Sequence, residues 1–329
     1  LRSEIIRSQR VKEIKEVIKL IFRWVHHTSL NPRERLMMVL FEMGMATLKD
    51  LSVVLGYTED RIYQLFKQIR YLKTQDEVAE LKVELEKVKS DVNLDKKQKA
   101  KRIKEINRKI KKIRDEWVRT YRKIPEKRGS ENRLLALGGK GVEYCTSLMH
   151  ERGAWEIKES QKDHYDGTNK ILVRLIKEFG QERLKWYYSY EARDVLVRTW
   201  ESIMSEEWKQ NPKLARKMKK EMIKPDALCL IDNVAYWIEF DNDTEKTKQL
   251  VEKYRSYQKT ICPEEAQNIK YPVIWVTTST HRRDELQNIW EVAKDEYLLK
   301  DESFPEMFFF VAGEETGWFK ERHGNFLSN

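Results

Sequence analysis

Residues 225–257 read PDALCLIDNVAYWIEFDNDTEKTKQLVEKYRSY, and this stretch predicts a strand, a tight turn, a second strand and a helix. Residues 227–231 form an apolar run of strand length, and the pair Asp232 and Asn233 is typical of a turn. Residues 234–241 are rich in β-branched and aromatic side chains, which favour strands. Thr244 is then suited to cap a helix. We expect the C-terminal half of the chain to be organised around this hairpin.

Three acidic residues of this hairpin are candidate metal ligands. Side chains alternate along a strand, so Glu239 and Asp241 project from the same face. Asp226 begins the neighbouring strand and can approach them across the sheet. Mg²⁺ (or Mn²⁺) prefers such oxygen ligands and keeps positions open for water and phosphate. The alternative interpretation is that the acids, together with Asp243, are polar residues at the exit of a strand.

This order of residues resembles the core of the PD-(D/E)xK nuclease superfamily. Pro225 and Asp226 are followed, after a short gap, by Glu239-x-Asp241. The resemblance implies that two acids hold the metal and that a lysine two residues after the second acid positions the attacking water. This chain has Asp241 at the lysine position, and Lys253 on the next helix is the candidate for a relocated cation.

Composition indicates a charged, folded protein with a polyanionic partner. The chain has 329 residues, of which 40% are hydrophobic and 36% charged, enough for two or three domains. Its formal net charge of +10 favours nucleic acid as a partner. The three cysteines lack metal-type spacing and predict a reducing, cytoplasmic setting. No apolar run is long enough to span a bilayer, so we expect no membrane partner.

The first 30 residues predict one amphipathic helix over residues 3–27, which we treat as a separate N-terminal element. His26 and His27 fall near its end, where we assign them a structural role.

Residues 31–72 predict a helix-turn-helix. Asn31 and Pro32 open a first helix, Thr47 caps a second, and Thr58 caps a third over residues 59–72. The third helix would present polar side chains to a DNA major groove, namely Arg61, Gln64, Lys67, Gln68 and Arg70. The alternative is a three-helix bundle that binds only protein.

Residues 73–116 predict a coiled coil. Val78, Leu81, Leu85, Val88 and Val92 step by three and four, and a second apolar stripe follows after residue 95. The first arm is mildly acidic and the second strongly basic, which favours a helical hairpin; a long dimeric rod is the alternative. Either a homodimer or a partner protein would then use the coiled coil.

Positive charge is concentrated in the second arm of the coiled coil and in the residues that follow it. Residues 96–128 contain sixteen Lys and Arg against four acidic residues, which indicates contact with phosphates. Residues 117–123 and 133–137 predict two strands that flank a basic loop, as in the wing of a winged helix. Lys123, Lys127 and Arg128 would reach DNA from this wing. We therefore predict one winged helix-turn-helix domain over residues 31–150, with the hairpin 73–116 inserted in it.

The second predicted domain, residues 151–329, has the element order of a nuclease-like core. A helix over 171–179 precedes a strand over 184–191, which ends at Glu191. A charged insertion over 192–222 then leads into the hairpin and its helix. A buried strand at 271–278, a helix at 282–295 and a last strand at 307–312 complete an α/β domain. The whole chain is thus predicted to be a multidomain α+β protein.

With this layout, the chain resembles the plasmid replication-relaxation protein family over residues 31–72 and 117–280. The residues that carry the resemblance are Leu137-x-x-Lys140-Gly141, His164, Trp186, Glu191, Pro225, Asp226, Glu239-Phe240-Asp241, Thr244, Glu245, Lys253 and Tyr257. The E-x-D departure from nucleases is a feature of that family, whereas the long coiled coil lies outside its usual pattern. The family is associated with replication and topological relaxation of plasmids and related mobile elements.

The resemblance implies a DNA-binding replication, relaxation or mobilisation factor of a plasmid, phage or integrative element. If the protein cuts DNA, Asp226 and Glu239 would bind Mg²⁺, Asp241 or Glu191 would supplement them, and Lys253 would steady the nucleophilic water. The alternatives are a non-catalytic scaffold whose nuclease-like domain has lost the reaction and a transcriptional regulator that uses only the winged helix.

Overall fold

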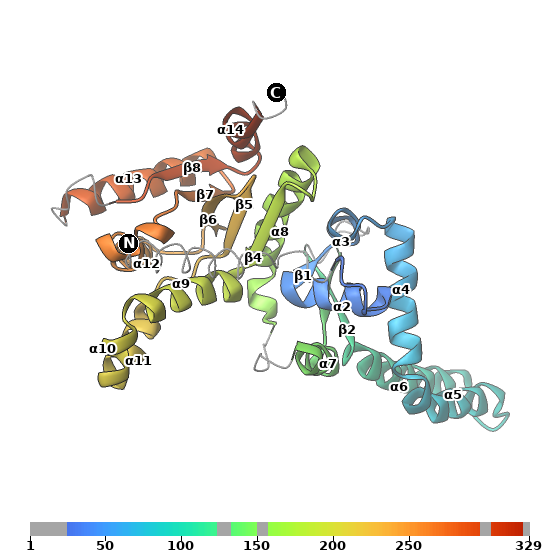
Figure 1. Cartoon of the computed structure of the whole chain (residues 1–329). Helices are drawn as coiled ribbons and strands as arrows, with labels where there is room; N and C mark the ends of the chain where they lie inside the picture. Colours follow the sequence, from blue (N-terminus) through green and yellow to red (C-terminus); the bar gives the residue numbers. More distant parts are fainter. Residues whose placement is uncertain (1–24, 124–132, 150–156, 297–303, 325–329) are drawn as a thin grey trace. The chain divides into compact units, whose positions relative to one another are not determined.

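The computed structural model describes residues 25–123, 133–149, 157–296 and 304–324. The chain is an α+β protein with two sheets, as predicted (Figure 1). It forms two compact units, which divide in sequence between Asn169 and Lys170. Most of the predicted N-terminal helix lies outside the described residues. Residues 25–30 form turns, so the helix does not extend to His27 as predicted.

The first unit begins with three short helices whose ends are set by side-chain caps. Asn31, Thr47 and Thr58 each accept hydrogen bonds from the first turn of the helix that they precede. Gly44 ends the first helix at φ 68°, where a Cβ would lie 2.6 Å from the Tyr165 ring, so only glycine fits. These elements are α2 (Pro32–Met43), β1 (Met45–Ala46), α3 (Leu48–Leu55) and α4 (Glu59–Leu72).

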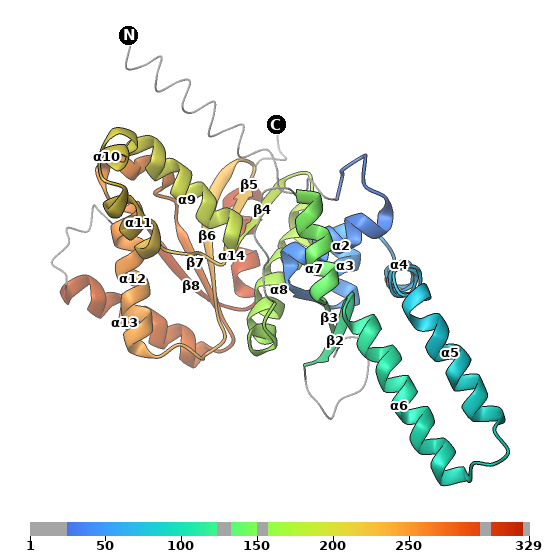
Figure 2. The ribbon, with the colours of Figure 1, turned by 90° about the horizontal axis from the view of Figure 1, so that it is seen from below.

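A helical hairpin follows, made of α5 (Gln75–Ser90) and α6 (Lys96–Asp115). The two helices pack side by side within one chain (Figure 2). Their shared apolar cluster contains Val78, Val88, Ile106 and Ile110. Val92, predicted in the apolar stripe, is instead 90% exposed in the turn between the helices. The first stripe therefore ends at Val88, and Asp95 caps α6.

The chain then returns to the first unit as a β-hairpin. Strands β2 (Val118–Arg122) and β3 (Arg133–Leu137) pair antiparallel, and β1 pairs with the other side of β3. Helix α7 (Gly139–Met149) follows. Met45, Leu134 and Ala136 form a buried cluster under this sheet.

The second unit is built on a five-stranded sheet of order β4-β5-β6-β7-β8. The first three strands pair antiparallel, and β6, β7 and β8 run parallel. The strands are β4 (Leu184–Tyr188), β5 (Ala227–Ile231), β6 (Val234–Asp241), β7 (Val273–Thr277) and β8 (Met307–Val311). The predicted hairpin therefore lies at the centre of the sheet.

Helices cover this sheet, and the core between them is rich in aromatic side chains. Trp237, Trp275, Tyr254 and Tyr257 are fully buried there. The helices are α8 (Lys162–Phe179), which crosses the division between the units, then α9 (Ser189–Ile203), α10 (Ser205–Gln210), α11 (Pro212–Glu221), α12 (Thr247–Ile261), α13 (Thr280–Glu296) and α14 (Glu314–His323). Short 3₁₀ segments lie at Glu159–Gln161 and Glu264–Ile269.

Two predicted details of this unit are wrong. Thr244 does not cap the helix; its hydroxyl donates to Asn242, and α12 begins after Lys246. The strand predicted to end at Glu191 ends at Tyr188, and Glu191 lies in the first turn of α9.

All three cysteines are buried, and burial raises the pKa of each thiol. Cys145 lies in α7, Cys229 in β5, and Cys262 just after α12. Among the described residues, no helix is long and apolar enough to cross a membrane.

Candidate functional site

The predicted acid Glu239 lies in the interior of the second unit, where α12 provides its partners. It is fully buried on β6. The Tyr257 hydroxyl donates to one carboxylate oxygen at 2.5 Å, and the Lys253 ammonium lies 2.8 Å from the other. Lys253 and Tyr257 are four residues apart on one face of α12, which explains how a single helix turn supplies both groups. The structure therefore places the candidate cation Lys253 beside Glu239.

Burial and charge act on this pair in opposite directions. Burial raises the pKa of Glu239, whereas the Lys253 charge, 2.8 Å away, opposes this rise and favours the ionised carboxylate; the nearby Asp226 charge acts in the same direction as burial. Burial alone would lower the pKa of Lys253, but the charges of Glu239, Asp226 and Glu245 outweigh it and raise that pKa. The ammonium is therefore protonated at neutral pH, and Glu239 is its buried counterion.

Asp226 is placed by backbone hydrogen bonds at the start of the hairpin. Its carboxylate accepts from the Phe240 N–H at 2.8 Å, and its own N–H donates to the Ile238 carbonyl at 3.1 Å. The Asp226 side chain thus connects the segment before β5 to β6 at Phe240, the residue that follows Glu239. Tyr188, at the end of β4, pairs with Ala227, so Glu191 follows at this same edge of the sheet.

Asp241 is engaged by an arginine that the sequence analysis did not single out. Arg282, in the first turn of α13, donates to both oxygens of Asp241 at 2.9 and 3.0 Å. The same guanidinium donates to the Glu245 carbonyl and to Glu285. Both Asp241 and Arg282 are buried. Arg282 stands in the first turn after a buried strand, but nothing local in the sequence indicates its partner 41 residues away.

The donor set does not fit a resident Mg²⁺ ion. Asp241 uses both oxygens on Arg282, and Glu239 accepts from Tyr257 with one oxygen while the other lies 2.8 Å from the Lys253 ammonium without a hydrogen bond among the described residues. Glu239 also has no exposed surface through which hydrated Mg²⁺ could reach it. Within the described ranges, no group of three or more His, Cys, Asp or Glu side chains is arranged to hold a metal. The cluster, as built, is a set of buried ion pairs that joins β6 to α12 and α13.

The candidate DNA-contacting side chains of α4 lie together on its exposed face. Arg61, Gln64, Lys67 and Gln68 are all exposed, whereas Ile62, Leu65, Phe66 and Ile69 on the other face are buried. The Lys67 ammonium lies 4.5 Å from the centre of the half-exposed Tyr63 ring. This face therefore offers guanidinium, ammonium and amide donors beside an aromatic ring.

Two other candidate DNA-contacting residues are engaged within the first unit. Arg70 donates to the Val118 carbonyl at 2.7 Å and to the Thr120 hydroxyl at 3.1 Å, so it ties α4 to β2. Lys123 forms an ion pair with Asp166 at 2.7 Å. Lys127 and Arg128 lie outside the described residues.

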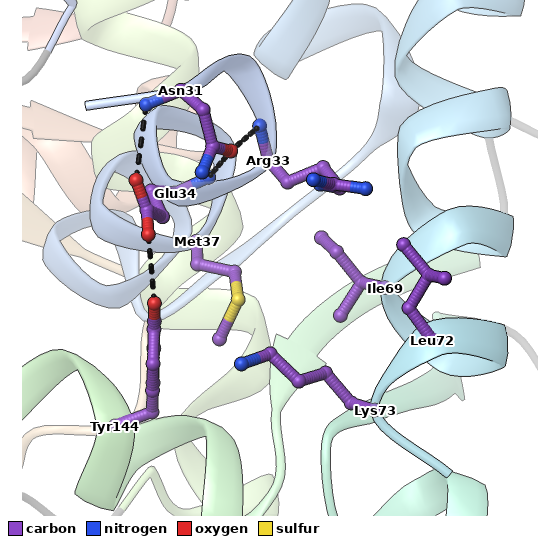
Figure 3. A pocket seen from close by; sticks show the side chains of 8 residues that line it. All are labelled: Asn31, Arg33, Glu34, Met37, Ile69, Leu72, Lys73 and Tyr144. Atoms are coloured by element: carbon purple, nitrogen blue, oxygen red, sulfur yellow. Dashed lines mark hydrogen bonds between the residues drawn. The ribbon is translucent and has the colours of Figure 1, made fainter. Parts of the chain in front are cut away.

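A small cavity of about 260 Å³ in the first unit has a structural explanation. It is lined by side chains of α2, α4 and α7 and by Lys73 (Figure 3). Tyr144 donates to one oxygen of Glu34 at 2.8 Å, and the Asn31 N–H donates to the other at 3.0 Å. Burial, followed by this hydrogen bond, raises the pKa of Tyr144 to about 12. The Lys73 ammonium lies 4.2 Å from the Tyr144 ring centre. The polar groups around the cavity thus serve helix capping and packing.

The central part of the chain matches a known protein family. The family model described as Replication-relaxation matches residues 94–275, more than half of the chain. The chain belongs to the replication-relaxation family. Membership indicates a role in the replication or relaxation of plasmids or related mobile elements. No curated protein and no solved structure matched the chain.

The replication-relaxation match covers the carboxylate cluster and part of the basic region. It includes Asp226, Glu239, Asp241 and Lys253, whereas Arg282 and the whole of α2 to α4 lie outside it. The match begins at Leu94 and so includes α6, although the sequence analysis placed the helical hairpin outside the usual family pattern.

Proposed function

We propose that this member of the replication-relaxation family binds duplex DNA through its first unit and does not cut it. The observation that carries the proposal is the exposed polar face of α4, with Arg61, Gln64, Lys67 and Gln68 on one side of a helix whose other side is buried. Arginine and glutamine make paired hydrogen bonds to base edges in the major groove, and lysine contacts phosphates.

The order of elements around α4 supports this role. Helix α3 ends at Gly56 in the left-handed conformation, which turns the chain sharply into α4, as in a helix-turn-helix. The β2–β3 hairpin then takes the place of a wing, and its connecting residues include Lys127 and Arg128. In this arrangement α4 would enter a major groove and the wing would contact an adjacent minor groove.

The second unit has the role of a scaffold in this proposal. A nuclease would need Asp226, Glu239 and Asp241 to offer carboxylate oxygens to Mg²⁺ beside water. In this chain Asp241 is bound by Arg282 and Glu239 by Lys253 and Tyr257, so the same acids hold the fold together. These acids therefore have a structural role in this proposal, without a metal-dependent step.

The test is DNA binding measured by fluorescence anisotropy with a labelled duplex. Replacing Arg61 and Lys67 together by Ala should weaken binding by roughly tenfold or more, because a base-edge contact contributes about 1–3 kcal/mol and a phosphate contact adds to it. The matched control replaces Lys248 and Lys259, two exposed cations of α12, by Ala and should leave the affinity close to wild type. A wild-type chain that does not bind duplex, or equal affinity of the two variants, would refute the proposal.

A further inference from the structure

A basic groove of about 500 Å³ lies in the first unit between α6 and the β2–β3 hairpin. Five cationic side chains line it from four elements, and one carboxylate accompanies them. They are Arg70 of α4, Lys111 and Arg114 of α6, Arg122 of β2, Arg133 of β3, and the acid Asp115. The groove therefore carries a clear excess of positive charge.

These cations lie close together, and one of them has an unmade hydrogen bond. Arg122 and Arg133 are directly opposite each other across the β2–β3 pair, where like charges are destabilising. The one carboxylate in the groove, Asp115, forms an ion pair with Arg70 at 3.8 Å. Arg70 is also the arginine that donates to the Val118 carbonyl of β2. The buried Nε of Arg114 has no hydrogen-bond acceptor among the described residues. An anionic ligand would supply the acceptor that Arg114 Nε lacks.

A line of lysines on α6 leads into this groove. Lys97, Lys104 and Lys111 are spaced by seven residues, so they lie on the same side of the helix, and all three are exposed. Helices α5 and α6 lie side by side (Figure 2), and α5 covers the apolar face of α6. By helical spacing, the lysine line is on another side of α6 from that apolar face. Fourteen residues of helix span about 21 Å, which is too long for a free phosphate or a single nucleotide.

We propose that this lysine line and the basic groove together hold the phosphate backbone of the duplex that α4 binds. The inference rests on the proposed function and extends it, because it makes the α5–α6 hairpin a backbone-binding arm. Arg114, Arg122 and Arg133 would contact phosphates at the base of the arm, and Lys104 and Lys111 would continue the contacts along α6. These contacts carry no base information and act on affinity and its salt dependence.

The experiment compares two double variants of the full chain that lose the same charge from the same helix. One carries Lys104→Gln and Lys111→Gln, and the control carries Arg102→Gln and Lys109→Gln. All four side chains are exposed, and the control pair lies about 160° around α6 from the tested pair. Binding to a labelled duplex is measured by anisotropy over a series of salt concentrations, with circular dichroism to confirm equal helix content.

We expect the tested pair to lower affinity by roughly ten- to thirty-fold at 0.15 M salt and to reduce the salt slope by about 2, because each lost phosphate contact removes about 0.9 from it. The control pair should change the slope far less.

Equal slopes for both variants, with wild-type duplex binding and the effect of Arg61 and Lys67 intact, would overturn this inference and leave the proposed function standing. A second result would also overturn it. If millimolar pyrophosphate displaces the duplex from wild type but not from the variant with Lys104→Gln and Lys111→Gln, the groove and the lysine line bind a small anion instead of a DNA backbone. A wild type that binds no duplex refutes both proposals.

Discussion

Asp241 illustrates how one changed residue alters what a strand end can do. A lysine at this position in the PD-(D/E)xK pattern would extend toward a metal-bound water. The shorter, negative aspartate instead attracts Arg282 from α13, which holds both of its oxygens. Because Arg282 also donates to the Glu245 carbonyl, one guanidinium fixes the end of β6 and the loop before α12. The position therefore serves the connection of sheet to helices.

At the same scale, Glu239→Gln should strongly destabilise the second unit. Glutamine keeps the shape and can still accept from Tyr257, but it removes the carboxylate that lies 2.8 Å from the Lys253 ammonium in the interior and leaves Glu245, at 3.4 Å, as its ion-pair partner. Breaking a buried ion pair in this way costs about 3–5 kcal/mol. The free energy of unfolding, measured by urea titration and circular dichroism, tests this value.

The matched double variant separates charge from packing. Glu239→Gln together with Lys253→Met removes both charges and should recover most of the lost stability, because the remaining groups are neutral and similar in size. If the single variant costs less than 1 kcal/mol, the ion pair does not have the structural role that we assign to it.

At the scale of elements, local signals in the sequence predicted much of the fold. The strand at 133–137 has the predicted bounds, and the caps at Asn31, Thr47 and Thr58 begin their helices as expected. The central hairpin is also in its predicted place. Such features depend on residues close in sequence, so a single sequence contains them.

Other elements depend on contacts that the sequence does not display. The charged stretch 192–222 forms three helices because Trp200 and Trp208 pack into the core of the sheet. Helix α14, which was not predicted, is held by Phe319 and by His323, whose ring bonds the Tyr236 hydroxyl at 2.8 Å. Distance along the chain also explains which residues of the candidate site could be predicted. Lys253 lies one helix after Glu239 and could be anticipated, whereas Arg282 comes from a helix beyond the next strand.

The helical hairpin provides a prediction at this scale. Ile106→Ala should loosen α5 and α6, because Ile106 is buried in their small shared cluster, and such a truncation costs about 2–5 kcal/mol. Hydrogen exchange should show faster exchange in α5 and α6 with little change in β5 to β7. Ile103→Ala, at a partly buried position of the same cluster, should have a smaller effect. Unchanged protection in the hairpin would show that it is stabilised elsewhere, as in a dimeric rod.

For the whole molecule, charge and chemistry are divided between the two units. The basic stretch 96–128 and the exposed face of α4 both belong to the first unit, and the buried ion pairs of Glu239 and Asp241 belong to the second. The unit that contacts DNA in our proposal is thus distinct from the unit that contains the carboxylate cluster.

A plasmid assay on the full chain tests this division. With Mg²⁺ or Mn²⁺ present, wild type should leave supercoiled plasmid intact at concentrations that saturate binding, because the carboxylates are occupied by protein donors. Agarose gel electrophoresis with chelator controls measures the result. Metal-dependent nicking by wild type that is lost in Glu239→Ala would instead establish a nuclease. Nicking that both proteins perform equally would point to a contaminant.

The burial of every cysteine gives the molecule an unreactive background for thiol chemistry. Dyes attach to exposed thiolates, and Cys145, Cys229 and Cys262 are buried with raised pKa values. Val92, almost fully exposed at the far end of the α5–α6 hairpin, can be exchanged for cysteine without loss of core packing. A single fluorophore attached there would report directly on whether the tip of the hairpin approaches a labelled DNA end, in a chain whose native residues are otherwise unchanged.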